Sequence, residues 1–467
     1  MSRYQLFIIS LVISVVIVIT PAVSAESLDE RTLISVPMDY IESLAKCETG
    51  LNRDTLDLIE VDDNSGSLKF LAGFDASNLL DSLDIPFSET ALPESNRDDR
   101  IDPQFMDFND VASALATYQS TYGTIMQRVQ IGTTSESRAI WAAKISDNVA
   151  QEEAEPAILF TGLHQAREIM STEIAMDIVD YLCTQYSSSS TVQDWVNHCE
   201  IWVVPMVNPD GSNYCWTMDE YWIKNRRNLG GEVYGVDVGH NYPVDWGACF
   251  GSSSDPNSNS YRGDTPGSEA ETQAIMTLAE THRPVMAVSY HSFNEFLLMP
   301  YGCYGEFVPE TNIITPLASQ IASEIRKDNG QYGYDFGHWW ELLYANDGNE
   351  VDYLYAEIGT IPVAIEVNAS SYYPSWSMRN TTLTRNRPGW QKALEIMVFG
   401  SMLKGTMTDA CTGQPVEAEF WWAEYPPTGK ETKRRSESNT GFYAIMGNSG
   451  SNTLMVEADG YQPVSVT

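Results

Sequence analysis

The stretch between residues 157 and 182 constrains the fold more than any other part of the chain. An apolar run at residues 157–160 leads into a polar segment that contains His164, Arg167 and Glu168, and apolar residues then recur with the spacing of one helix face. These three side chains therefore lie where a buried strand is predicted to end and a helix to begin. Because ligands bind at such strand ends in open α/β sheets, we expect a functional site here.

Apolar strand patterns alternate with amphipathic helix patterns from residue 106 to residue 402. The predicted strands are 140–145, 157–160, 201–204, 285–290 and 361–367, and the predicted helices are 111–122, 171–184, 268–281, 313–327 and 388–402. This alternation predicts an α/β domain with a mixed, mostly parallel sheet flanked by helices.

The regions on either side of this domain have different patterns. Residues 26–88 show strands and helices in the order β-α-β-β-α, which is typical of a small ferredoxin-like α+β module. Residues 89–105 are rich in Pro, Asp, Asn and Arg and are predicted to be a linker. The pattern leaves open whether the module is a removable pro-segment or a permanent domain. Residues 403–467 have short strand patterns with Gly and Pro turns, which predict a small β-sandwich with a stabilising or a ligand-binding role.

The first 25 residues have the pattern of a secretory signal peptide. Arg3 precedes an apolar core at residues 6–20, and Val23-Ser24-Ala25 has the small residues of a cleavage site. A retained membrane anchor is the alternative, but the core is short for a spanning helix. We therefore expect a secreted or periplasmic protein with no stable membrane span after removal of the signal.

Charge and cysteine content narrow the class of protein further. The chain has 27 Lys and Arg against 64 Asp and Glu, a net charge of −37, which excludes nucleic acid as a partner because few basic groups could replace the counterions of phosphate. In an exported protein some of the seven cysteines should pair. Cys183 with Cys199 and Cys215 with Cys249 are candidate pairs from their places between elements, although connectivity cannot be read from sequence.

Six blocks of motifs follow one another through the predicted α/β domain. They are residues 164–168, 204–211 with 222–226, 235–242, 261–263 with 268–273, 290–293 with 299–302, and 344–366. In this order the blocks resemble the zinc carboxypeptidase family, the carboxypeptidase A-like metallopeptidases, over roughly residues 106–400. The last stretch, 403–467, resembles the transthyretin-like module appended to many carboxypeptidases.

The resemblance implies one zinc ion, held by two histidines and one glutamate with water at an open position. By position, Glu168 is the glutamate ligand and His291 is the second histidine. The first histidine of the family falls on Gln165, so this metal-ligand position is substituted. Asp237 matches the carboxylate that orients the first histidine.

The resemblance also implies catalytic and substrate-binding residues. Glu366 matches the glutamate that acts as general base and then as proton donor, and Tyr344 matches the mobile tyrosine that closes over substrate. Arg167 matches an arginine of the substrate groove. Val351 matches a specificity position, where an apolar residue favours an apolar pocket.

Four positions depart from the family pattern. Gln165 presents an uncharged amide, which is a poor zinc ligand. Ile223 replaces the arginine that stabilises the oxyanion, a kind of loss that typically costs about 10²–10³ in rate. Gly239 and His240 replace the Asn-Arg pair that binds the terminal carboxylate of a substrate. His164 or His240 would supply the missing ligand after a local shift; the alternatives are that His164 packs at the strand end and that His240 lies on a solvent-facing loop.

Three functions are compatible with these residues. The first is a secreted zinc metallocarboxypeptidase that hydrolyses a peptide or protein substrate with a zinc-activated water and Glu366 as general base. The second is a catalytically silent homologue that binds peptides or cell-surface material, and the third is a purely structural assembly. Metal content and turnover separate the first two, because they share one fold.

Overall fold

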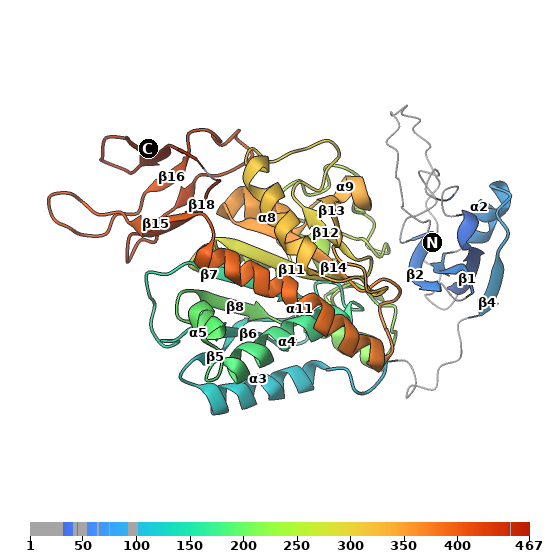
Figure 1. Cartoon of the computed structure of the whole chain (residues 1–467). Helices are drawn as coiled ribbons and strands as arrows, with labels where there is room; N and C mark the ends of the chain where they lie inside the picture. The colour runs from blue at the N-terminus through green and yellow to red at the C-terminus, as the bar shows by residue number, and fades with distance from the viewer. Residues whose placement is uncertain are drawn as a thin grey trace.

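The computed structural model describes residues 31–40, 44, 54–62, 65–73, 75–91, 101–448 and 450–467. Figure 1 shows a large central domain with a small N-terminal module on one side and the C-terminal strands on the other. The predicted signal peptide and most of the predicted linker lie outside the described residues. In the described part of the chain no helix is both long and apolar enough to cross a membrane.

An eight-stranded mixed sheet forms the central domain, in the order β13-β12-β14-β11-β7-β8-β6-β5. The strands are β5 (Met126–Thr133), β6 (Ala139–Ile145), β7 (Ala157–Gly162), β8 (Glu200–Val204), β11 (Met286–Ser292), β12 (Phe296–Met299), β13 (Asp335–His338) and β14 (Ile361–Val367). The four central strands β8, β7, β11 and β14 run parallel, and antiparallel pairings flank them. The predicted fold class is confirmed: a mixed α/β sheet flanked by helices.

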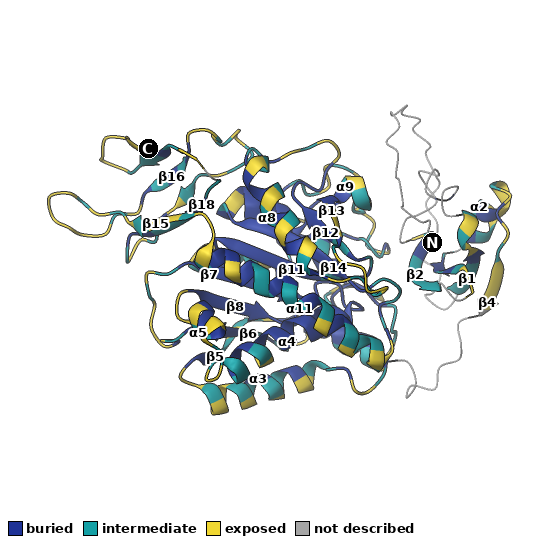
Figure 2. Ribbon diagram, viewed as in Figure 1, coloured by how far each residue is buried: buried dark blue, intermediate teal, exposed yellow. Residues whose placement is uncertain are grey.

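Helices cover both faces of this sheet, so its central strands are buried (Figure 2). Every residue of β7, β8 and β14 is buried. The helices of the domain are α3 (Phe108–Tyr122), α4 (Ile169–Gln185), α5 (Ser190–Val196), α6 (Pro209–Thr217), α7 (Ala270–His282), α8 (Thr311–Glu324), α9 (Trp339–Leu342), α10 (Glu350–Tyr353) and α11 (Trp376–Phe399). Burial on both faces explains why the strand sequences are continuous apolar runs instead of alternating patterns.

Helix α11 begins twelve residues before its predicted start at residue 388. The predicted start coincides with Pro388, and proline is favoured in the first turn of a helix. Pro388 instead lies inside the helix, and Ser375 caps the true start by accepting a hydrogen bond from the N–H of Met378 (3.3 Å). Buried side chains such as Leu383 and Trp390 lie before and after the proline. Packing of this face on the core therefore outweighs the cost of proline in the helix.

The N-terminal module has its own antiparallel sheet, in the order β2-β3-β1-β4. Its elements are β1 (Thr32–Pro37), η2 (Met38–Tyr40), β2 (Leu56–Asp62), β3 (Ser67–Ala72), α2 (Ala76–Ser82) and β4 (Ser88–Ala91). Strand β4 lies at the start of the stretch that we expected to be linker. Much of the first predicted helix, 38–47, lies outside the described residues. A separate apolar core, which includes Ile34, Phe70 and Leu80, holds the module together.

Two small sheets make up the C-terminal region. One pairs β15 (Met402–Thr406) with β18 (Phe442–Met446), and the other has the order β17 (Arg434–Arg435), β16 (Glu419–Trp422), β19 (Leu454–Glu457) and β20 (Val464–Val466). Phe420, Trp422 and Ile445 belong to the same buried cluster as the central domain. This region therefore packs on the central domain through a shared apolar core.

The two disulfides suggested by the sequence are wrong. Cys249 pairs with Cys303, with a Cα–Cα distance of 5.6 Å, and joins two loops of the central domain. Cys183, Cys199 and Cys215 are buried free thiols. The predicted pairs joined cysteines that are near one another in sequence. Cys303 lies 54 residues from Cys249 in sequence but close to it in space.

Candidate functional site

A pocket opens at the carboxyl ends of the central parallel strands. Its lining residues are His164, Gln165, Gly239, His240, His291, Trp339, Tyr344, Asn346, Asn349, Glu350, Val351 and Glu366. His291 and Glu366 are register partners near the ends of β11 and β14. The parallel sheet therefore brings together residues that are far apart in sequence, as expected for a ligand site in an α/β protein.

The turn that follows β7 positions the 164–168 segment. Leu163 has a φ of 58°, in the left-handed region that a branched side chain rarely adopts. Its N–H donates a hydrogen bond to Ser171 Oγ (2.8 Å), which holds this conformation. The chain then enters α4 with Glu168 at the N-cap position, where the helix dipole favours a negative charge.

Glu168 and His291 are in direct contact. Oε2 of Glu168 lies 3.0 Å from Nδ1 of His291, and the N–H of Ser292 donates to the same oxygen (3.4 Å). Burial alone would lower the pKa of His291, but the hydrogen bond and charge of Glu168, with the charges of Glu366 and Glu350, raise it to about 9. The two side chains at the predicted ligand positions therefore form an ion pair at neutral pH.

Gln165 lies at the third ligand position and is bonded elsewhere. Its Nε2 donates to the two carboxylate oxygens of Asp237, at 3.2 and 3.3 Å. Asp237 thus binds an amide where the family pattern has a histidine. Among the described residues, no group of three or more His, Cys, Asp or Glu side chains could hold a metal ion. The residues present do not fit the three-ligand zinc site that the sequence resemblance implies.

Two of the other three substituted positions, Ile223 and Gly239, are also committed to the fold. Ile223 is buried, and its backbone carbonyl accepts a hydrogen bond from the N–H of Ala166 (2.9 Å), so it braces the 164–168 segment without offering a charge. Gly239 lies against Gln165: a Cβ there would be 3.1 Å from Gln165 Nε2 and 3.2 Å from Asp237 Oδ1. The small residue at 239 and the amide at 165 are therefore matched to each other.

Both histidines considered as replacement ligands are buried. His240 is only 2% exposed and lies within hydrogen-bond distance of the Asp347 carbonyl through Nδ1 (2.8 Å), so the expected solvent-facing loop is wrong. His240 and Tyr242 lie against the loop that contains Gly348, and the N–H of Tyr242 donates a hydrogen bond to the Gly348 carbonyl. His164 is 1% exposed, and its Nε2 lies 2.9 Å from the hydroxyl of Tyr242.

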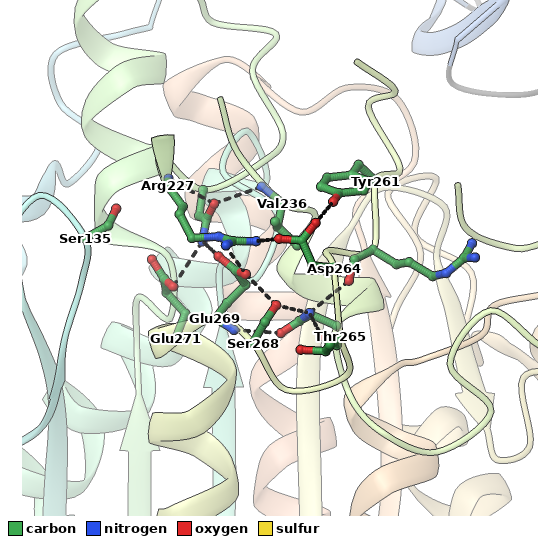
Figure 3. A network of polar contacts seen from close by, with 12 residues as sticks. Ser135, Arg227, Val236, Tyr261, Asp264, Thr265, Ser268, Glu269 and Glu271 are labelled. Atoms are coloured by element: carbon green, nitrogen blue, oxygen red, sulfur yellow. Dashed lines mark hydrogen bonds and ion pairs between the residues drawn. The ribbon is translucent and has the colours of Figure 1, made fainter. Parts of the chain in front are cut away.

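A polar network borders the 236–241 loop, which begins at Val236 (Figure 3). Arg227 lies between Asp264 (3.2 Å) and Glu269 (3.0 Å) in this network. The N–H of Glu269 donates to Asn241 Oδ1 (3.0 Å), and Asn225 Nδ2 donates to Glu269 (2.8 Å) and Glu271 (3.1 Å). The loop is therefore held by buried amides and carboxylates, and by ion pairs that are partly exposed at Arg227 and Asp264.

Arg167, predicted to contact substrate, lies outside the pocket. It is fully buried, and its guanidinium donates to both carboxylate oxygens of Asp57 (2.5 and 2.9 Å) and to the hydroxyl of Tyr372 (3.1 Å). Asp57 belongs to β2 of the N-terminal module. In this structure Arg167 therefore joins the module to the central domain.

The remaining predicted residues line the pocket. Glu366 lies at the pocket wall, 6% exposed, and Tyr344 is 41% exposed. Val351 is buried in a small apolar cluster with Leu298 and Trp339. The apolar wall expected from Val351 is present, but it is only one side of the pocket.

Glu350 is the main lining residue that sequence reasoning missed. It is 4% exposed and accepts hydrogen bonds from Thr161 Oγ1 (2.9 Å) and Ser289 Oγ (2.5 Å). Burial raises its pKa, and these two hydrogen bonds oppose the rise. A carboxylate next to the predicted specificity residue Val351 was the available signal. The sequence did not reveal that Glu350 faces the pocket, because a shift of one position changes the direction of a side chain in the short helix α10.

An α/β sheet of this order, with a pocket at the ends of β7, β11 and β14, defines a carboxypeptidase-like fold. A family model described as zinc carboxypeptidase matches residues 111–387, and the chain belongs to that family. Metallocarboxypeptidase A of Trichophyton tonsurans is 31% identical over 251 residues, which cover 53% of this chain and 59% of the relative. Carboxypeptidase A2 of Mus musculus is 28% identical over 252 residues, with the same coverage.

Solved structures show the same fold. The crystal structure of carboxypeptidase A from Helicoverpa armigera aligns with a TM-score of 0.64 and 21% identity over 79% of this chain and 97% of its own. Thrombin activatable fibrinolysis inhibitor aligns with a TM-score of 0.63 and 19% identity over 79% and 98%. The chain spans 59% of the length of these two sequence relatives.

Proposed function

We propose that this protein is an exported, peptide-binding member of the zinc carboxypeptidase family in which zinc-dependent hydrolysis is impaired. The supporting observation is the position of Gln165, whose amide is bonded to Asp237 where the family pattern requires a histidine ligand. Glu168 and His291 neutralise each other without a metal ion. Export is supported by the pattern of residues 1–25.

Loss of charge at the other substituted positions supports the same function. Ile223 and Gly239 offer no side-chain hydrogen-bond donor, and none of the described pocket-lining residues is Lys or Arg. Neither a developing oxyanion nor a terminal carboxylate therefore meets a guanidinium in the pocket. The fold that shapes the pocket is nevertheless complete, which favours binding over a purely structural role.

Peptide hydrolysis is the second candidate, because one observation favours it. Glu366, in the general-base position of the family pattern, lines the pocket together with His291 and Tyr344. A carboxylate near bound peptide can accept a proton from attacking water. Without the positive charges named above, we expect any such turnover to be slow.

The test combines binding and turnover on one peptide. Purified protein is titrated calorimetrically with an N-acetylated tetrapeptide acid that ends in leucine, and the same mixture is followed by mass spectrometry for released leucine. Our proposal predicts measurable binding and no release above the protein-free rate. Release that Glu366→Gln abolishes, and that the exposed-site control Glu357→Gln leaves intact, would establish the hydrolase instead.

A further inference from the structure

The pocket has an excess of negative charge. Glu350 and Glu366 line it, and Glu168 lies directly behind His291. His291 Nδ1 already contacts Glu168 Oε2 at 3.0 Å. Two carboxylates therefore line a pocket whose walls include no lysine or arginine.

Glu350 is buried and has unused hydrogen-bonding capacity. A carboxylate can accept about four hydrogen bonds. Thr161 and Ser289 donate to Glu350, and His164 Nε2 lies 3.4 Å from its Oε2. No lysine or arginine among the described residues forms an ion pair with Glu350. A buried carboxylate without a cationic partner is costly, and a cation that entered the pocket would offset that cost.

Polar atoms without partners border the same space. Nδ1 of His164 and Oδ1 of Asn346 are buried and have no hydrogen-bond partner among the described residues. Both side chains line the pocket, and both are more than nine-tenths buried. Because buried polar groups are almost always satisfied, such a pair at a pocket wall points to a ligand with several hydrogen-bonding hydrogens.

Aromatic rings complete the walls. Trp339 and Tyr344 both line the pocket, and the Trp339 ring is edge-on to His291 at a centroid distance of 6.2 Å. Indole and phenol rings attract a cation placed over their faces. Carboxylates, an amide oxygen and aromatic faces together are the groups that recognise an alkylammonium ion.

On the basis of the peptide binding proposed above, we infer that this pocket takes a primary ammonium group of a peptide, with Glu350 as its principal counter-ion. The ammonium group enters where the family pattern provides for a carboxylate. The three N–H donors of such a group match the free capacity of Glu350 and an amide oxygen such as that of Asn346. A lysine side chain and a free amino terminus both carry this group.

Four tripeptides of equal length test this inference by calorimetric titration of the whole protein at pH 7.5. They are N-acetyl-alanyl-alanyl-lysine amide, the same peptide with norleucine for lysine, the norleucine amide with a free amino terminus, and the acetylated norleucine peptide as a free acid. We expect the lysine amide, the free-amine peptide, or both, to bind at least tenfold more tightly than the neutral norleucine amide. The tighter of the two identifies the source of the ammonium group. The free acid should bind no more tightly than the neutral amide.

Substitution of the counter-ion completes the test. Glu350→Gln should reduce the preference for the ammonium peptide to less than threefold, whereas Glu357→Gln, at an exposed glutamate near the same helix, should leave it unchanged. Full preference in Glu350→Gln would overturn the assignment of Glu350. The wild-type comparison stands by itself if Glu350→Gln does not fold.

The outcomes for the inference and for the proposed function are distinguishable. Equal binding of all four peptides, or tighter binding of the acid, would overturn the ammonium pocket but leave peptide binding in place. No detectable binding of any peptide would overturn both.

Discussion

Two loops of the central domain differ in how far they keep the family pattern. The turn after β8 keeps the family motif Asn208-Pro209-Asp210-Gly211, and the loop 236–241 has Gly239 and His240 where the family pattern has Asn and Arg. Asn208 caps α6 by accepting a hydrogen bond from the N–H of Gly211 (3.0 Å). Asp210 is fully buried and accepts hydrogen bonds from Thr134 Oγ1 (2.7 Å) and Arg138 Nη1 (2.8 Å).

The difference separates side chains that hold the fold from side chains that hold a ligand. The polar groups of the first turn are bonded inside the protein, so their loss would leave buried groups unsatisfied. Gly239 has no polar side chain, and His240 has one close side-chain contact, with the Asp347 carbonyl (2.8 Å), so fewer buried bonds depend on these two side chains. Substitutions at pocket-lining positions such as 239 and 240 are what the proposed function predicts.

The largest effect should come from the turn that kept the motif. Asp210→Ala removes the buried partner of Arg138 and the acceptor for the N–H of Glu136 (2.8 Å). We expect a loss of about 3–5 kcal/mol in the free energy of unfolding, as for one partner of a buried ion pair. Urea denaturation measures it, with Asp459→Ala at an exposed site as the control. A loss below about 1 kcal/mol would contradict the structural role of Asp210.

A smaller but clear effect is expected at the contact between the N-terminal module and the central domain. Asp57→Asn leaves the fully buried guanidinium of Arg167 with no carboxylate, although Tyr372 still accepts a hydrogen bond. A hydrogen bond to a charged group contributes about 1.5–3 kcal/mol, so we expect a loss of about 2–3 kcal/mol.

The matched control for Asp57 is Glu60, which lies on the same strand. Glu60 pairs with Lys69 at 2.9 Å, and both side chains are 37% exposed. Glu60→Gln should change the free energy of unfolding by less than about 1 kcal/mol. Equal effects of the two substitutions would show that the contact between Arg167 and Asp57 is not a buried anchor.

The free energy of unfolding should depend on pH through Glu271, which belongs to the network beside the 236–241 loop. Burial raises the pKa of Glu271 to about 7 from its ordinary value of 4.5, against the hydrogen bond from Asn225. The folded state therefore binds a proton more tightly than the unfolded state. Its stabilising contribution is full below pH 4.5 and is lost as the pH rises through about 7. The loss amounts to roughly 1–3 kcal/mol.

Glu271→Gln removes this titration but keeps an oxygen for Asn225. Its stability curve should fall less than the wild-type curve between pH 4.5 and pH 7.5, measured by urea denaturation at each pH. Parallel curves for the two proteins would show that Glu271 does not titrate as inferred.

Substitutions at residues 239 and 240 should change peptide binding more than the free energy of unfolding. Gly239→Asn with His240→Arg would return a guanidinium and a carboxamide, which should favour a peptide acid over its amide by at least about tenfold. The asparagine Cβ would press on Gln165, 3.1 Å away, so the full effect should need Gln165→His as well. Calorimetry with matched acid and amide peptides measures the preference. An unchanged preference in the triple variant would mean that position 240 does not face the peptide end.

The sequence predicted the elements of the fold better than the contacts of the residues around the pocket. Apolar runs and helix spacing were enough for the sheet, and the family resemblance gave Glu168, His291 and Glu366, which the parallel strands bring to one edge of the sheet. The start of α11 and the disulfide partner of Cys249 were not predictable, since both depend on contacts between distant segments.

The ligand side of the site was harder to predict for a physical reason. Glu350 faces the pocket and Arg167 faces the N-terminal module because of local turns that no periodic pattern encodes. His240 is buried because the loop around Gly348 covers it. A family motif gives the position of a residue along the chain, but packing decides what its side chain contacts.

The zinc content of the purified protein is the most direct test of the impaired metal site. Wild-type protein and Gln165→His are dialysed against buffer with micromolar zinc and analysed for bound metal, with Gln127→His as a control for an added surface histidine. We expect well under one zinc per chain in the wild type and in the control, and close to one in Gln165→His, because Glu168, His291 and Asp237 are already in place. One tightly bound zinc per wild-type chain would contradict an impaired metal site, and loss of that zinc in His164→Ala or His240→Ala would identify the replacement ligand.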